Sequence, residues 1–146
     1  MQELNLITNE SIYKKKNYFC NNLEMKNIVD GLEKYYSINF FCRTSKEKKF
    51  HNMKSKKVIQ CKNIISYLYS VYKKTKVRDS KYLIISITPY TFLSYIFLKI
   101  LRKKIFIYIR SDGFYEYKKK LGVIGFLIYG IMFFFIFLNK KIITNN

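Results

Sequence analysis

Short apolar segments alternate along the chain with longer segments in which apolar residues recur at helical spacing. The short segments are continuously apolar, which is typical of strands whose two faces are both covered by other parts of the protein. We therefore expect strands at residues 3–8, 38–42, 82–87 and 104–109, with a weaker one at 57–61.

The segments between these strands have the period of amphipathic helices, and several carry capping signals. Asn22 suits the cap of a helix over 23–36, and Thr88 followed by Pro89 suits the start of a helix over 89–102. A third helix is expected over 63–76. Strands that alternate with helices of this length predict an α/β protein, a Rossmann-like parallel sheet with flanking helices. The basic segment 46–57, with the single histidine His51, is expected to be an exposed loop.

A very hydrophobic helix is expected at 121–138, because this segment carries no charged residue and lies between two groups of lysines. At 1.5 Å per residue it would be about 27 Å long, close to the roughly 30 Å thickness of a bilayer core. Its apolar residues run all round the helix, so it must be covered by lipid as a single membrane span or by protein. The residues that follow, 139–146, are expected to form a polar tail, which leaves 1–138 as the folded domain.

The composition suggests a partner with negative charge. Lysine and arginine number 28 against 9 acidic residues, a net charge of +19. Lysine dominates, and alanine and tryptophan are missing, which is typical of an AT-rich genome and weakens the inference to nucleic acid. No zinc spacing, helix-turn-helix or aromatic RNA-binding pair accompanies the charge. We expect an anionic membrane surface as partner and no nucleic acid; a basic nucleic-acid binder is the weakest of three hypotheses.

Other chemistry-bearing residues are few. Cys20, Cys42 and Cys61 are widely spaced, which suits neither a zinc site nor a disulfide framework, and we expect Cys42 and Cys61 to be buried thiols in a cytosolic protein. The sequence has no phosphate-binding glycine loop and no metal-nucleotide motif. We expect no metal site and no cofactor in this chain.

Two neighbouring strands of the expected sheet end in compact polar clusters. In an open parallel sheet, ligands bind beyond the carboxyl ends of the strands, where these clusters would lie. Thr88 and Pro89 follow the first strand, and residues 110–113 follow the second. Arg110 is suited to a phosphate or carboxylate, and Asp112 to a sugar hydroxyl or to proton transfer. The same residues could instead serve only as a helix cap and a turn.

The stretch "IISITPYTFLSYIFLKILRKKIFIYIRSDGFYEYKKKLGVIGFLIYGIMF" at 84–133, together with "NIVDGLEKYYSINFFCR" at 27–43, resembles the N-terminal, acceptor-side domain of GT-B-fold bacterial glycosyltransferases, the glycosyltransferase 4-like domains. The resemblance implies that two loops contribute to an acceptor cleft. The residues that it places there are Thr88, Pro89 and Tyr90 in the first loop, and Arg110, Ser111 and Gly113 in the second, with Asp112 as the catalytic candidate.

The resemblance also implies a function. A complete enzyme would move a sugar from a nucleotide sugar to a lipid-linked glycan acceptor in surface polysaccharide synthesis, at the cytoplasmic face of the cell membrane. The donor-binding domain of such enzymes has no counterpart in these 146 residues. We therefore expect a half that is inactive alone, either a split subunit that works with a separate donor-domain polypeptide or a truncated product or gene remnant. The alternative is a small single-pass or membrane-anchored protein without catalytic activity.

Overall fold

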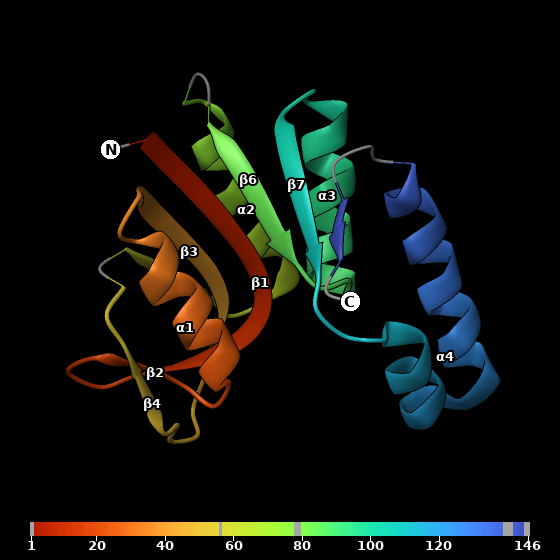
Figure 1. Ribbon diagram of the computed structural model, residues 1–146, viewed down its shortest axis with the longest axis horizontal. Helices are drawn as coiled ribbons and strands as arrows, with labels where there is room; N and C mark the ends of the chain where they lie inside the picture. Colours follow the sequence, from red (N-terminus) through yellow and green to blue (C-terminus); the bar gives the residue numbers. More distant parts are fainter. Residues whose placement is uncertain (1, 56, 78–79, 139–141, 145–146) are drawn as a thin grey trace.

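The computed structural model describes residues 2–55, 57–77 and 80–138, and the backbone of 142–144. It is an α/β protein in which one mixed sheet lies between helices (Figure 1). The strands are β1 (Gln2–Lys14), β2 (Tyr18–Cys20), β3 (Tyr36–Ser45), β4 (His51–Met53), β5 (Val58–Cys61), β6 (Lys81–Ile85), β7 (Lys104–Ile109) and β8 (Ile142–Thr144). The helices are α1 (Leu23–Leu32), α2 (Ile64–Thr75), α3 (Pro89–Ile100) and α4 (Gly113–Phe137).

The parallel strands lie in the order β5-β3-β1-β6-β7-β8. Leu83 of β6 lies opposite Leu6 of β1 on one side and Phe106 of β7 on the other. The prediction that residues 82–87 and 104–109 form adjacent strands running the same way is confirmed for the paired parts of β6 and β7. From β1 the chain first adds β3 and then β5 on one side of the sheet. It then adds β6, β7 and β8 on the other side, so the strand order reverses between β1 and β6.

The expectation of a wholly parallel sheet is wrong, because β2 and β4 are antiparallel additions. β2 pairs with the far end of β1, beyond the part that pairs with β6, and β4 pairs with β2. The segment 46–57 is therefore not simply a loop: His51 lies in β4 opposite Cys20 and is half-buried. Each of these strands has only three residues, too few for a period to be visible in the sequence.

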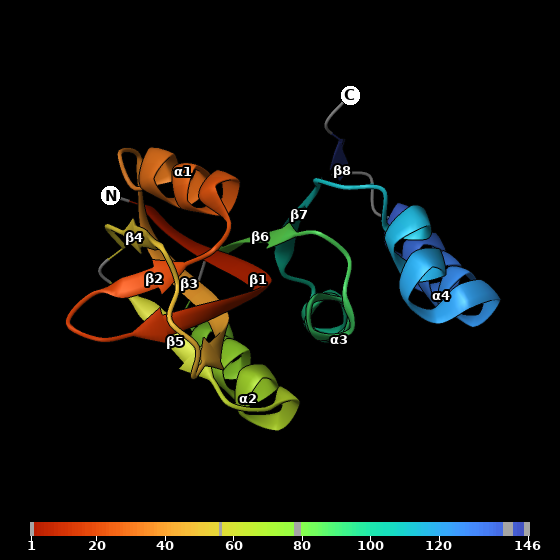
Figure 2. The ribbon, with the colours of Figure 1, turned by 90° about the horizontal axis from the view of Figure 1, so that it is seen from below.

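The helices cover the two faces of the sheet unequally. α1 lies on one face, and α2, α3 and α4 lie on the other (Figure 2). The core beneath α1 contains Leu6, Met25, Val29, Ile38 and Phe40. The larger core beneath the other three helices contains Ile7, Tyr67, Val71, Ile84, Tyr95, Leu98, Ile107, Tyr129, Met132 and Ile136.

The expected helix starts are confirmed at the two predicted caps. The Asn22 side chain accepts a hydrogen bond from the Met25 backbone N–H (2.9 Å), and Thr88 and Thr91 form a reciprocal capping box around Pro89. α1 ends at Leu32, earlier than expected, because Tyr36 already belongs to β3, where it pairs with Gln2.

α4 is long and apolar enough to cross a membrane by length and composition, but it is not one straight rod. Gly122 has φ +65° and ψ −147°, a conformation essentially restricted to glycine, and it divides α4 into 113–121 and 123–137. The Phe114 ring lies 5.4 Å from that of Phe133, whereas 19 residues of straight helix would separate them by roughly 28 Å. The second half of α4 therefore folds back beside the first.

The chain returns to the sheet after α4. Residues 142–144, expected in a polar tail, form β8 and pair in parallel with β7, with Ile107 opposite Ile142. The remainder of the expected tail, 139–141 and 145–146, lies outside the described residues.

Candidate ligand site

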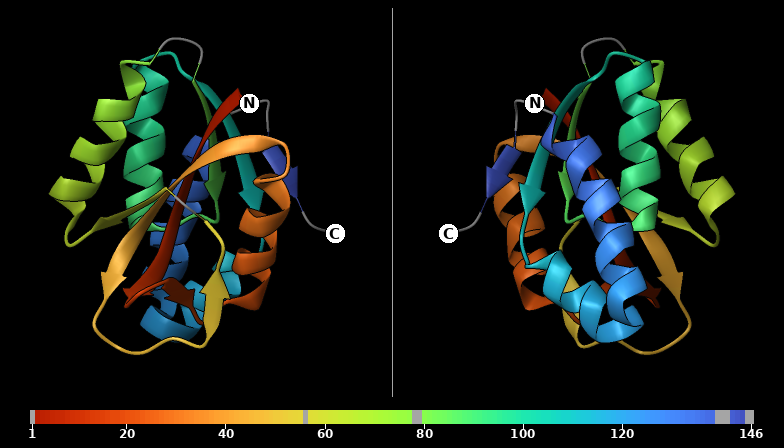
Figure 3. Two further views of the ribbon diagram at one scale, coloured as in Figure 1. Left: turned by 90° about the vertical axis from the view of Figure 1, so that its left-hand side faces the viewer. Right: turned by 90° about the vertical axis from the view of Figure 1, so that its right-hand side faces the viewer.

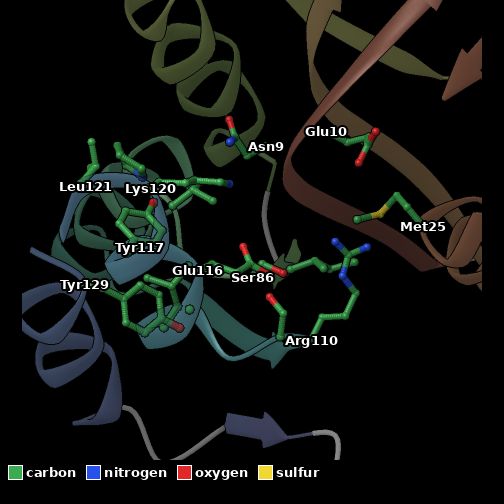
Figure 4. Close-up of a pocket in the computed structure, with 16 residues that line it drawn as sticks. Asn9, Glu10, Met25, Ser86, Arg110, Glu116, Tyr117, Lys120, Leu121 and Tyr129 are labelled. Carbon is green, nitrogen blue, oxygen red and sulfur yellow. The ribbon is translucent and has the colours of Figure 1, made fainter. Parts of the chain in front are cut away.

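A cavity of about 480 Å³ lies at the carboxyl ends of β6 and β7 and beside the far half of β1 (Figure 4). The starts of α3 and α4 close it on the other side. Its lining includes Asn9, Glu10, Met25, Ser86, Thr88, Pro89, Arg110, Ser111, Gly113, Glu116, Tyr117, Lys120, Leu121 and Tyr129. The cavity thus occupies the crevice beside the reversal of strand order, where open α/β sheets bind their ligands.

Asn9 and Glu10 reach the cavity because β1 leaves its regular pairing with β3 between Ile7 and Ser11. The Tyr67 hydroxyl compensates for the interrupted ladder by donating to the Thr8 carbonyl oxygen (2.6 Å) and accepting from the Thr8 N–H (3.1 Å). Arg43 Nε donates to the Asn9 carbonyl oxygen (3.1 Å). Such bulges redirect side chains at the rims of sheets, and here the bulge turns two polar residues toward the cavity.

Ser86 ends β6 in a strained conformation, with φ +62°. Its N–H donates to the Tyr108 carbonyl oxygen (2.9 Å), and its carbonyl oxygen accepts from the Thr91 hydroxyl (2.8 Å). Left-handed backbone at a non-glycine residue costs free energy and is often found at ligand sites. These two bonds hold the Ser86 side chain at the cavity wall.

Arg110 follows β7 and is the cavity's most buried positive charge, with 21% of its side chain exposed. Its Nε lies 3.6 Å from Oε2 of Glu24, a half-exposed carboxylate near the start of α1. Its Nη1 is buried and has no hydrogen-bond partner in the part of the chain that the structure describes. The guanidinium therefore has an unused N–H donor group that could bind an anion.

Three residues that line this cavity (Figure 4) each carry a buried side-chain polar atom with no partner among the described residues: Oδ1 of Asn9, Oγ of Ser86 and Nη1 of Arg110. Among the described residues, only one other side-chain atom is in this condition, Oγ of Ser55, and it does not line the cavity. Buried polar groups are nearly always hydrogen-bonded, and leaving one unsatisfied costs about 1–3 kcal/mol. The set comprises one donor, one acceptor and one hydroxyl that can do either, which suits a ligand with both anionic and hydroxyl groups.

Glu10 contributes a carboxylate to the same cavity. Burial raises its pKa above the ordinary value, while the positive charges of Arg110, Lys49 and Arg43 act in the opposite direction without cancelling the effect. A carboxylate with a raised pKa is a better proton acceptor than an exposed one. Glu10 is thus the acidic group of the cavity best suited to take a proton from a bound hydroxyl.

The structure brings together most of the residues that the sequence singled out. Thr88, Pro89, Arg110, Ser111 and Gly113 all line the cavity. The predicted acceptor-binding roles of these residues stay predictions.

Tyr90 and Asp112 are not among the lining residues. The Tyr90 ring packs edge-on against Tyr67 at 5.4 Å and lies beneath the Arg43 guanidinium. Asp112 is exposed and caps α4 by accepting a hydrogen bond from the Tyr115 N–H (3.2 Å). A catalytic role of Asp112 remains untested, but the contact that the structure gives this side chain is the alternative one, a helix cap.

The cavity residues that the sequence did not indicate are chiefly Asn9, Glu10 and Ser86. Asn9 and Glu10 follow the first predicted strand, so the rule that polar clusters after strands form the site could have found them. Ser86 had no such signal, because its importance comes from a backbone conformation.

None of the three cysteines is among the residues that line the cavity. Cys20, Cys42 and Cys61 are buried and free, as expected for Cys42 and Cys61, and burial raises the pKa of all three thiols. Nowhere in the described part of the chain do three or more histidine, cysteine or acidic side chains gather as metal ligands would.

Comparisons of the chain with protein-family models, with curated proteins and with solved structures find no match. The function is therefore argued from the geometry of the cavity and of the surface around it.

Proposed function

We propose that this chain is the acceptor-binding half of a sugar transferase. Its cavity would hold the phosphate and sugar hydroxyls of a lipid-linked glycan acceptor at the inner face of the cell membrane. The sugar donor would be a nucleotide sugar bound by a separate donor-domain polypeptide, so the chain alone would be inactive and would need no metal or cofactor of its own.

The observation that carries this proposal is that three residues lining one cavity each have an unpartnered polar atom. Arg110 Nη1 can donate to a phosphate oxygen, and the Asn9 and Ser86 oxygens can accept from sugar hydroxyls. The strand order adds support. Counted in chain order, the parallel strands β1, β3, β5, β6, β7 and β8 lie in the sheet as 3-2-1-4-5-6, the order of doubly wound dinucleotide-binding folds, which bind their ligand at the reversal. The resemblance of 84–133 and 27–43 to acceptor-side domains points to the same class.

The transfer step requires a base for the acceptor hydroxyl. As the hydroxyl oxygen attacks the anomeric carbon, its proton would pass to the Glu10 carboxylate, and the bond between that carbon and the nucleoside diphosphate would break. Burial of Glu10 favours this role, since it raises the pKa of the carboxyl group.

The proposal is tested by measuring the binding of short-chain prenyl diphosphate monosaccharides to the detergent-solubilised chain by calorimetry. We expect Arg110→Ala to weaken binding by about 10- to 100-fold, because a charge-assisted hydrogen bond contributes roughly 1.5–3 kcal/mol. The corresponding prenyl alcohol, which has no phosphate, should bind both proteins equally weakly.

Lys104→Ala is the matched control, because it removes the same charge from the opposite end of the same strand. It should leave the affinity within about twofold of the parent, as expected for an exposed charge. Equal losses in the two variants would mean that Arg110 acts only through net charge, and that the cavity is not the binding site.

A second candidate function is a membrane-anchored protein without catalysis. The observation in its favour is the exposed apolar surface of α4. It predicts membrane association with no measurable affinity for the prenyl diphosphate sugars, so the same titration separates the two.

A further inference from the structure

The second half of α4 presents an unusually apolar surface to solvent. Its outward side chains are 41% to 70% exposed. They are Val123, Ile124, Phe126, Leu127, Ile128, Ile131, Phe134, Phe135, Phe137 and Leu138, and no polar side chain interrupts them. Figure 3 (right) shows α4 on the outside of the molecule, in front of the sheet. Contiguous apolar patches of this kind mark protein or membrane interaction sites.

The opposite side of the same half-helix is committed to the protein. Tyr129, Met132 and Ile136 are almost wholly buried in the core beneath α3, and they recur at helical spacing. The Tyr95 hydroxyl donates to the Phe135 carbonyl oxygen (3.2 Å). The helix therefore has one side that packs on the protein and one apolar side that is free. A membrane span surrounded by lipid would require the buried side chains of this helix to leave the core.

The path of the chain also argues against a span. β7 precedes α4 and β8 follows it, and the two are neighbours in one sheet. The chain from Leu138 to Ile142 can reach only about 14 Å, whereas a bilayer core is roughly 30 Å thick. Residues 123–137 themselves extend only about 22 Å. With β8 paired to β7, both ends of α4 must lie on the same side of a membrane.

The charge beside the patch indicates which partner fits. Lys118, Lys119 and Lys120 are exposed in the turn before the kink, and the whole chain carries +19. Lysines next to an apolar face are attracted to anionic lipid headgroups while the face enters the acyl region. A second copy of the chain would instead bring two strongly positive molecules together.

We propose that α4 docks in the plane of an anionic bilayer, with residues 123–138 embedded in a single leaflet and Lys118–Lys120 at the headgroups. The kink at Gly122 lets the helix fold back against the sheet instead of crossing. Docking in this way does not depend on the proposed function. One consequence rests on the proposed function: because Lys120 and Leu121 also line the cavity, docking would turn the cavity rim toward lipid-linked ligands.

The test is co-sedimentation of the full chain with vesicles of phosphatidylcholine alone and with 30% phosphatidylglycerol added. We expect binding chiefly to the anionic vesicles. The double variant Leu127→Glu/Phe134→Glu should lower that binding at least tenfold, since both side chains are more than half exposed on the patch.

The matched control is Ile65→Glu/Tyr69→Glu on α2, which introduces the same charge at two side chains that are also more than half exposed. It should bind the vesicles nearly as well as the parent. Equal losses in both double variants, or no loss in either, would overturn the proposal. So would a soluble dimer that the α4 variant dissociates, together with no vesicle binding by the parent.

The depth of α4 distinguishes docking from spanning. The chain has no tryptophan, so Phe134→Trp provides a single reporter. In-plane docking predicts a blue-shifted emission that is quenched more by lipids labelled near the headgroup than by lipids labelled at the bilayer centre. It also predicts that a tag placed after Asn146 stays open to protease added outside the vesicles. A protected tag with quenching at the centre would show a span instead.

Discussion

At the scale of single residues, Glu10 and Arg110 determine the electrostatics of the cavity. They approach it from two strands, β1 and β7, that are not direct neighbours in the sheet. Arg110 lowers the pKa of Glu10, yet burial is the larger influence and leaves this pKa raised. The cavity therefore contains a carboxyl group whose pKa is higher in the folded protein than in an exposed position.

This raised pKa predicts a pH dependence of stability. Because the pKa of Glu10 is higher in the folded than in the unfolded state, its contribution is fully present below the unfolded pKa and is lost as the pH rises through the folded pKa. Glu10→Gln should therefore lose less stability than the parent between about pH 4 and pH 7, in urea unfolding at each pH. Parallel pH profiles for the two proteins would contradict the raised pKa.

The two residues also differ in how far the sequence revealed them. Arg110 was predicted as a site residue because it directly follows an apolar strand. Glu10 was not, although it follows the first predicted strand. In the structure β1 continues to Lys14, and Glu10 reaches the cavity through a bulge that the Tyr67 hydroxyl supports from α2. A hydrogen bond between residues 59 positions apart leaves no periodic signal in the sequence.

At the scale of elements, α4 is the part whose sequence allowed two interpretations, a membrane span or a helix covered by protein. Gly122 provides the kink, and Gly125 lets the halves approach, since a Cβ there would collide with the Tyr117 carbonyl oxygen. With the halves side by side, one face of 123–137 is buried and the other is free.

Two isoleucines of α4 test this one-sided packing. Ile136 is fully buried and Ile131 is 59% exposed. Ile136→Ala should lower the free energy of unfolding by about 2–5 kcal/mol, because it leaves a cavity in the core. Ile131→Ala should stay within about 0.5 kcal/mol of the parent in the same urea titration. Similar losses in both variants would mean that the helix is not packed as described.

At the scale of the whole molecule, the positive charge is the most conspicuous property. It is spread along the chain, and some of it is neutralised locally, as where Lys74 Nζ lies 3.0 Å from a Glu3 carboxylate oxygen. Binding that depended on this charge alone would fall steeply with added salt. Binding through insertion of an apolar helix face would not fall steeply with added salt.

The salt dependence of binding therefore distinguishes an anionic membrane from a nucleic acid as the partner. We expect binding to anionic vesicles to weaken by less than tenfold between 50 mM and 300 mM salt, because apolar insertion persists. Binding to duplex DNA or to RNA in a mobility-shift assay should disappear over the same range, since only counterion release would support it. Tight nucleic-acid binding at 300 mM salt would favour the third hypothesis, which the sequence made the weakest.

The sequence by itself determined the alternation of strands and helices, the caps at Asn22 and Thr88, and the polar ends of β6 and β7. These features follow from periodicity and capping, which act between residues close together in the chain. Only the tertiary structure decided which polar residues line the cavity, that α4 folds back, and that β8 returns to β7. Each of these depends on contacts between distant residues, such as Thr8 with Tyr67 and Ile107 with Ile142, and such contacts form only when the chain packs.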